Sequence, residues 1–318
     1  MCRISNLDPP VLERTYQDMA AMPIPHNPNE QKHADWTSVG SDATAKKTHA
    51  SLQTALDGLA RQRDVEIFLQ GSYANHTNIR ADSDVDVVVM TRQTYRGNAN
   101  SASMAPELRA AWSNAPTATY LTTDLRRDVL AALRSYYGAE FVEEKNKCIK
   151  IHKRDGYLDA DVVPCIQYRH YSPQSRALRS GYKEGVAIHP VTGDVIVNFP
   201  KEHKKNGQNK NKDCSKRYKA TVRQVKRLRN DAVRLGLLES GGAPGYLLEC
   251  MVFNAPRRLF GPHDSDRLHS VVEWLTTANL AGFDSCDRIN TLFGTDPGGF
   301  TIERGELIAR SLNAAINA

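Results

Sequence analysis

The chain has 318 residues, of which 40% are hydrophobic and 25% are charged, with a formal net charge of +6 at pH 7. No apolar run approaches the roughly 18 residues of a membrane span, and the opening stretch MCRISNLDPP lacks a signal-peptide pattern. The six cysteines contain no C-x-x-C pair, which argues against a zinc cluster or a disulfide framework. These features predict a globular cytoplasmic protein of one large domain or two, with no membrane partner.

Residues 1–40 contain several prolines and a stretch, residues 11–19, that could form a short helix. We expect this segment to pack on the core or to be partly extended. Ser41 or Asp42 could cap a following helix, and residues 65–69 are predicted to form a short strand. The apolar residues of that helix recur at helical spacing: Leu52, Leu56 and Leu59.

The stretch LQGSYANHTNIRADSDVDVVVM, which follows, contains two features that suit a metal-bound nucleoside triphosphate. Asp84 and Asp86 lie in a predicted strand, where alternating side chains place both carboxylates on one face. Adjacent carboxylates repel each other unless a cation lies between them, and oxygen ligands suit Mg²⁺ or Mn²⁺. The turn expected at Gly71 and Ser72 offers a close backbone approach and a hydroxyl, which suits a phosphate. The alternative is an edge strand with a solvated acidic face.

Residues 91–119 are polar and rich in Gly, Asn and Ser, and are expected to form a loop or an insertion. A helix is predicted at residues 123–137. Two strands are predicted at residues 147–152 and 158–163, joined by a turn, with a further hairpin at residues 186–198.

The strand at residues 158–163 carries two more acids, Asp159 and Asp161, on one face. Two-metal phosphoryl transfer needs a carboxylate that joins a D-x-D pair and lowers the pKa of the attacking hydroxyl. Either acid could therefore complete the site. The alternative is a pair of surface acids on a hairpin.

Residues 201–230 contain eight Lys and four Arg against two acids, a net charge of +10. Because the whole chain carries +6, the remainder carries −4, so the positive charge is local. Such a window commonly forms a solvated face or a nonspecific nucleic-acid patch. Long helices are predicted at residues 218–237, 266–280 and 301–316.

A Gly-Ser pair followed after about a dozen residues by D-h-D-h-h, where h is a hydrophobic residue, is similar to the motif of the polymerase-β-like nucleotidyltransferase superfamily. Within it, GSYANHTNI and SDVDVVV are similar to the bacterial cGAS/DncV-like nucleotidyltransferases, the CD-NTases, and the resemblance covers residues 41–318. It selects Asp161, directly before Val-Val-Pro, as the third acid. It implies that Lys226, in VRQVKRLRN, contacts the triphosphate, and that Tyr246, in APGYLLEC, stacks on a base. Gly245 departs from the family pattern, which has Ser, and Tyr246 could alternatively be a core aromatic.

The resemblance implies an α/β (α+β) fold: a polymerase-β-like core with a mixed sheet over residues 41–200, and a C-terminal helical lobe of oligoadenylate-synthase type over residues 201–318. It implies an enzyme that joins nucleoside triphosphates into a cyclic di- or trinucleotide second messenger with release of pyrophosphate. The substrates would be ATP and a nucleoside triphosphate with one other base. Two Mg²⁺ or Mn²⁺ ions would bind Asp84, Asp86 and Asp161. The product would act on a separate effector protein in bacterial anti-phage (CBASS) signalling, and no nucleic acid is required.

Two other classes remain open. One is a nucleotidyltransferase of the same superfamily that extends RNA ends or modifies a protein or small molecule. The other is a non-catalytic nucleic-acid-binding module, which would bind through residues 201–230 in a salt-dependent manner and show no turnover.

Overall fold

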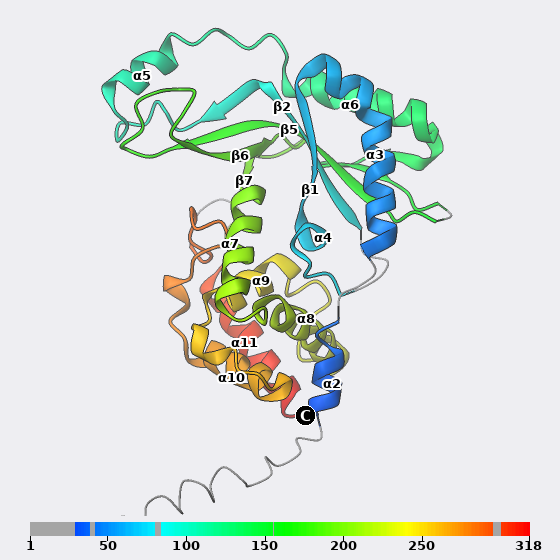
Figure 1. The fold of residues 1–318 in the computed structure, drawn as a ribbon, viewed down its shortest axis with the longest axis vertical. Coiled ribbons are helices and arrows are strands. Elements are labelled where there is room, and N and C mark those ends of the chain that lie inside the picture. The colour runs from blue at the N-terminus through cyan, green and yellow to red at the C-terminus, as the bar shows by residue number, and fades with distance from the viewer. Residues whose placement is uncertain (1–28, 39–41, 80–83, 155, 295–299) are drawn as a thin grey trace, which may run out of the picture.

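The computed structural model describes residues 29–38, 42–79, 84–154, 156–294 and 300–318. The helix considered at residues 11–19 lies outside these ranges. The described chain forms two lobes, one above the other in Figure 1: a sheet flanked by helices at the top and a group of helices below.

A mixed seven-stranded sheet forms the first lobe. Its order is β1-β2-β5-β4-β3, with β6 paired to β5 and β7 paired to β6. β2 and β5 run parallel and the other pairs are antiparallel, so the carboxylate-bearing starts of β2 and β5 meet at the same end. The strands are β1 (Val65–Leu69), β2 (Val85–Gly97), β3 (Val142–Glu144), β4 (Ile149–Ile151), β5 (Ala160–Tyr171), β6 (Tyr182–Ile188) and β7 (Ile196–Asn198).

Two helices, α3 (Asp42–Arg63) and α6 (Thr122–Tyr137), cover one face of this sheet, as Figure 1 shows. The alternate residues of β2 pack against them in one buried cluster, listed with their helical partners: Val85, Val87 and Val89 with Leu52, Leu56, Leu125, Val129 and Leu133. Strict alternation then directs Asp86 to the opposite face. The expectation that Val85 and Val87 occupy the face opposite to Asp86 is confirmed.

The second lobe is helical and also holds the described part of the N-terminal segment. In α2 (Glu30–Asp35), the Glu30 carboxylate accepts hydrogen bonds from the N–H groups of Asp264 and Ser265, at 2.6 and 2.7 Å. Glu30 thereby satisfies free donors at the start of α10. The main helices of this lobe are α7 (Pro200–Asp213), α8 (Tyr218–Arg234), α9 (Gly245–Asn254), α10 (Asp264–Thr277) and α11 (Ile302–Ile316).

The structure confirms the helix predicted at residues 123–137, the hairpin at residues 186–198 and the two C-terminal helices, but it corrects two other predictions. Residues 91–119 are not simply a loop or insertion, because β2 continues to Gly97 and α5 (Pro106–Ser113) follows. The polar composition of the segment hid both elements. The positively charged stretch at residues 201–230, here called the basic window, also contains an unpredicted helix, α7. The nearly uniform polarity of this helix leaves no apolar periodicity to recognise.

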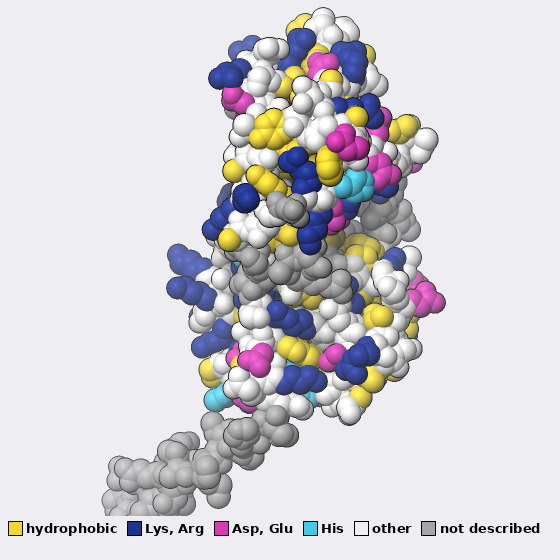
Figure 2. All heavy atoms as spheres, turned by 90° about the vertical axis from the view of Figure 1, so that its right-hand side faces the viewer, with side chains coloured by type: hydrophobic (Ala, Val, Ile, Leu, Met, Phe, Trp, Pro, Cys, Tyr) yellow, Lys and Arg dark blue, Asp and Glu magenta, His cyan; other side chains and the backbone are white. Residues whose placement is uncertain are grey.

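The charge of the basic window is divided between surface and interior. Lys204 and Lys205 on α7 are exposed, whereas Lys226 is buried and Arg223 donates hydrogen bonds to the carbonyl groups of Thr37 and His76. On the face shown in Figure 2, basic side chains occur over both lobes and are interspersed with acids. The window is therefore not one uniform solvated face.

The remaining structural expectations concern membranes and disulfides. Within the described ranges, no helix is both long and apolar enough for a membrane span. The five cysteines that the structure describes are all free thiols.

Candidate active site

The Gly-Ser pair begins the short helix α4 (Gly71–Asn75), rather than forming the turn expected from the sequence. Gly71 has a φ of +66°, and a Cβ atom placed on it would lie 2.2 Å from Oδ2 of Asp86. The N–H of Gln70 donates to the carbonyl oxygen of Asp86 at 2.9 Å. Only glycine allows the backbone to pass this close to the carboxylate in this conformation.

The acidic residues are brought together by the pairing of β2 with β5. Asp86 and Asp161 are direct partners in the parallel register, and Asp84 lies just before β2. On the other side of β5, Lys150 of β4 is the antiparallel partner of Asp161, and its Nζ donates to Oδ2 of Asp84 at 2.7 Å. Asp86, Asp161 and Lys150 thus form a row across three strands. Asp159 is held apart, because its Oδ1 accepts the N–H of Lys153 at 2.6 Å.

The electrostatics of this row suit a divalent cation. Burial, followed by the charges of Asp161 and Asp84, raises the pKa of Asp86 to about 7, although Lys150 opposes the shift. Oδ1 of Asp161 is buried and accepts no hydrogen bond within the described structure. An unpaired buried carboxylate oxygen beside two more carboxylates fits a hard cation with oxygen ligands. Among the described residues, no three His, Cys, Asp or Glu side chains lie close enough together to hold a metal ion. The Asp84 carboxylate forms an ion pair with Lys150.

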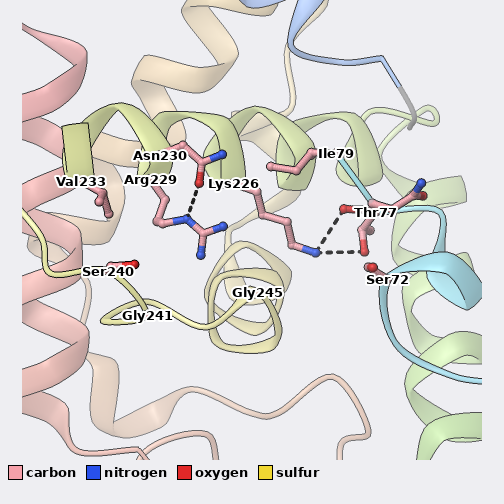
Figure 3. A pocket seen from close by; sticks show the side chains of 11 residues that line it. Ser72, Thr77, Ile79, Lys226, Arg229, Asn230, Val233, Ser240, Gly241 and Gly245 are labelled. Atoms are coloured by element: carbon pink, nitrogen blue, oxygen red, sulfur yellow. Dashed lines mark hydrogen bonds between the residues drawn. The ribbon is translucent and has the colours of Figure 1, made fainter. Parts of the chain in front are cut away.

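A cavity of about 440 Å³ lies between α4, α8 and the start of α9. Figure 3 shows Lys226 extending from α8 toward Thr77, with Ser72 close by and Arg229 and Asn230 further along the same helix. Hydroxyl, amide and cationic groups therefore line a space large enough for a triphosphate chain. Its lining comprises Ser72, Thr77, Asn78, Ile79, Lys226, Arg229, Asn230, Val233, Ser240, Gly241 and Gly245.

Lys226 is held by a buried polar network that joins the two lobes. Its Nζ donates to the carbonyl oxygen and the hydroxyl of Thr77 at 3.1 and 3.2 Å, and lies 3.6 Å from the Glu249 carboxylate. Glu249 also accepts from Thr77 and contacts Nε2 of His203, at 2.8 and 2.9 Å. Burial lowers the pKa of Lys226, and Glu249 opposes that shift. Burial would raise the pKa of Glu249, but Lys226, His203 and Thr77 outweigh it and hold the pKa at about 2.

A second cavity, of about 270 Å³, lies beside the acids. Tyr246 and Phe199 contribute aromatic rings to its wall, and Tyr246 is 43% exposed, with an edge-on contact to His203 at 5.5 Å between centroids. The amide of Asn198 in the wall offers both a donor and an acceptor, which could read a base edge. The full lining is Gln70, Gly71, Ala74, Asn75, Asp86, Asn198, Phe199, Pro200, His203, Tyr246 and Asp287.

The two cavities adjoin where consecutive residues line one cavity and then the other. Gly71 lines the second cavity and Ser72 the first; Tyr246 lines the second and Gly245 the first. A nucleotide could therefore extend from one to the other past α4 and α9. Of the residues singled out from the sequence, Asp84 and Asp161 are not among the wall residues of either cavity, but they adjoin Asp86 on its sheet face.

Sequence reasoning missed several residues of this site. His203 and Asn198 flank a Phe-Pro pair before a polar segment, and nothing in that pattern indicated an aromatic cavity. Arg229 lies three residues after Lys226, so helical spacing could have placed it on the same face. Lys150 alternates with two isoleucines, which could have placed it on the face opposite to the core.

Comparison with known proteins adds independent findings. A family model of the nucleotidyltransferase domain matches residues 52–181, and a model of the cGAS/DncV-like nucleotidyltransferase C-terminal helical domain matches residues 205–317. The cyclic UMP-AMP synthase of Rhodothermus marinus is 37% identical over 294 residues, covering 92% of this chain and 97% of that protein. The cyclic dipyrimidine nucleotide synthase CdnE of Legionella pneumophila is 30% identical over 273 residues, covering 84% and 90%.

Solved structures match the fold as well. That of the Rhodothermus marinus CdnE c-UMP-AMP synthase with Apcpp and Upnpp has a TM-score of 0.80 at 36% identity, covering 92% of this chain and 96% of that one. That of the Elizabethkingia meningoseptica CdnE cyclic dinucleotide synthase with GTP and Apcpp has a TM-score of 0.73 at 26% identity, covering 90% and 97%. The predicted fold class, a mixed-sheet core with a C-terminal helical lobe, is confirmed. The chain belongs to the cGAS/DncV-like nucleotidyltransferase family and is a nucleotidyltransferase.

Proposed function

We propose that this enzyme joins ATP to a second nucleoside triphosphate and closes the product into a cyclic di- or trinucleotide. The observation that carries the proposal is the row of Asp86 and Asp161 beside two adjoining cavities, one polar and cationic, the other aromatic. The similarity to a cyclic UMP-AMP synthase over 92% of the chain supports UTP as the second substrate and a dinucleotide as the product. Each ring closure of two nucleotides requires two transfers, and each transfer releases one pyrophosphate.

We assign the polar cavity to the triphosphate of the donor nucleotide. Lys226 and Ser72 would hold phosphate oxygens there, with the ammonium acting as a point charge. Tyr246 would stack on the base in the adjoining aromatic cavity, a contact worth about 1–3 kcal/mol for any base. This placement leaves the α-phosphorus near Gly71, where the backbone lies against Asp86.

The reaction is an in-line displacement, in which the acceptor hydroxyl oxygen bonds to the α-phosphorus as its bond to pyrophosphate breaks. Asp84, Asp86 and Asp161 would hold two Mg²⁺ or Mn²⁺ ions, which lower the pKa of a bound hydroxyl and offset the charge of the phosphates. Asp161, with its buried unpaired oxygen, would help to activate the acceptor 2′- or 3′-hydroxyl. The same proposal assigns residues 41–200 to the catalytic core and residues 201–318 to the helical lobe.

The biological part of the proposal is that the product activates a separate effector in anti-phage signalling in the cytoplasm. Membership of the cGAS/DncV-like family supports it. A synthase of this kind needs no nucleic acid as a primer, because its own substrates supply both the attacking hydroxyl and the leaving group.

The product itself tests the proposed function. The protein is incubated with each pair of the four ribonucleoside triphosphates and Mg²⁺ or Mn²⁺, then treated with phosphatase and analysed by mass spectrometry. We expect a phosphatase-resistant product from ATP and UTP without primer. Product that forms only with an RNA primer, or label transferred to protein, would instead support another nucleotidyltransferase activity. Salt-dependent RNA binding without turnover of any nucleotide would support a non-catalytic module.

Variants test the assignment of the acids. Replacing Asp84 and Asp86 together by Ala should abolish the product while leaving the melting temperature unchanged or higher, because clustered like charges are removed. Asp159→Asn is the matched control: this acid is near the others in sequence but hydrogen-bonded to Lys153, and its replacement should leave turnover within a few-fold. Near wild-type activity in the double variant would refute the assignment.

A further inference from the structure

Lys150 lies on the same sheet face as the three carboxylates, although no sequence motif draws attention to it. Its neighbours in β4, Ile149 and Ile151, belong to the buried cluster under α3 and α6, so Lys150 faces the opposite side. It is the direct partner of Asp161 across the β4–β5 ladder, as Asp86 is across β2–β5.

The ammonium of Lys150 is the positive charge that this cluster of acids holds. Its Nζ lies 2.7 Å from Oδ2 of Asp84, and its side chain retains 20% of its accessible surface. Among the ion pairs of the described residues, this is the one that includes Asp84, Asp86 or Asp161. An Asp84 oxygen committed to an ammonium is not free to bind a metal ion.

We propose that Lys150 is a positioning residue that keeps the three carboxylates together before the metal binds and competes with the metal for Asp84. The ammonium offsets the mutual repulsion of the acids in the metal-free enzyme. Metal binding then requires Asp84 to exchange the ammonium for the metal ion, so Lys150 sets how tightly the site binds divalent cations. This inference rests on the proposed function, which assigns the acids to metal binding.

Two effects of opposite sign follow for Lys150→Met, which keeps the apolar stem and removes the charge. Without metal, the acids lose their counter-charge, and the melting temperature should fall. With metal, the competitor is gone and the repulsion between two cations is relieved, so affinity for the ion should rise. Because Lys150 and Asp84 are both partly exposed, the gain in affinity should be modest, roughly 3- to 10-fold.

The experiment is a titration with Mn²⁺ alone, followed by calorimetry, and thermal unfolding in EDTA and in saturating Mn²⁺. We expect Lys150→Met to bind Mn²⁺ more tightly than the wild type and to show a larger Mn²⁺-induced rise in melting temperature. Lys150→Arg should restore wild-type values of both. Lys145→Met is the matched control, since it removes an exposed lysine paired with Glu143 and should leave Mn²⁺ binding unchanged.

Two outcomes would overturn the inference, and they differ from each other. If the wild type binds Mn²⁺ but Lys150→Met binds it equally and is destabilised equally with and without metal, Lys150 serves only packing. If the wild type binds Mn²⁺ no better than the Asp84→Ala, Asp86→Ala double variant, the acids are not the metal site. The second result would remove the proposed function of the acids along with the role of Lys150.

Discussion

Gly71→Ala offers a sharp test of the geometry between α4 and the acids. A Cβ atom at this position would lie 2.2 Å from Oδ2 of Asp86, so the carboxylate or the helix would have to retreat by about 1 Å to reach ordinary contact. The left-handed backbone of Gly71, with φ at +66°, adds about 1–2 kcal/mol of strain for a residue with a side chain. Displacing a catalytic group by about 1 Å can cost about 100-fold in rate.

The strain and the displacement can be separated by a control. Gly236 has a φ of +72°, nearly the same, but a Cβ atom there meets nothing within 4 Å. Gly236→Ala should therefore share the loss of about 1–2 kcal/mol of stability without the loss of turnover. The measurements are kcat for product formation and the melting temperature of both variants. If Gly71→Ala keeps kcat within a few-fold of Gly236→Ala, the contact between Gly71 and Asp86 does not constrain catalysis.

Three further predictions concern α9. Tyr246→Ala should weaken binding of a non-hydrolysable triphosphate by about 1–3 kcal/mol in calorimetry, and Tyr246→Phe should cost little; a lower melting temperature with unchanged affinity would assign the ring to packing alone. Gly245→Ser should tighten binding of the same triphosphate by about 1.5–3 kcal/mol, because the added hydroxyl could donate a hydrogen bond to a charged phosphate. The side chain should be tolerated, since its Cβ would lie 3.4 Å from Cε of Lys226 and Gly245 lacks a positive φ. Unchanged affinity would contradict this prediction. Glu249 has its pKa lowered from 4.5 to about 2, so it stabilises the fold above pH 4.5 and this stabilisation is lost as pH falls toward 2. We therefore expect Glu249→Gln to have a lower free energy of unfolding than the wild type at pH 7, measured with urea, and to lose less of it as the pH falls from 4.5 toward 2. An equal loss in both proteins over this pH range would count against the network.

Much of the catalytic lobe was predictable from local patterns. The alternation Asp-Val-Asp-Val determines that acids and valines occupy opposite faces, whatever strand lies beside them. Apolar spacing predicted α6 and the two C-terminal helices, because a helix that buries one stripe must repeat it. The close backbone approach predicted at Gly71 was an approach to a phosphate, whereas the structure shows that the residue lying against Gly71 is Asp86.

The tertiary structure decided which groups meet. The parallel pairing of β2 with β5 places Asp161, rather than Asp159, beside Asp86, and such long-range pairing depends on the whole sheet, which no local pattern specifies. The antiparallel pairing of β4 with β5 brings Lys150 to Asp84, from a strand that carries one charged residue between two isoleucines. In the basic window, burial separates Lys226 from the exposed Lys204 and Lys205. Only the tertiary structure, which brings α9 and the segment after α4 beside α8, gives Lys226 the buried partners Thr77 and Glu249.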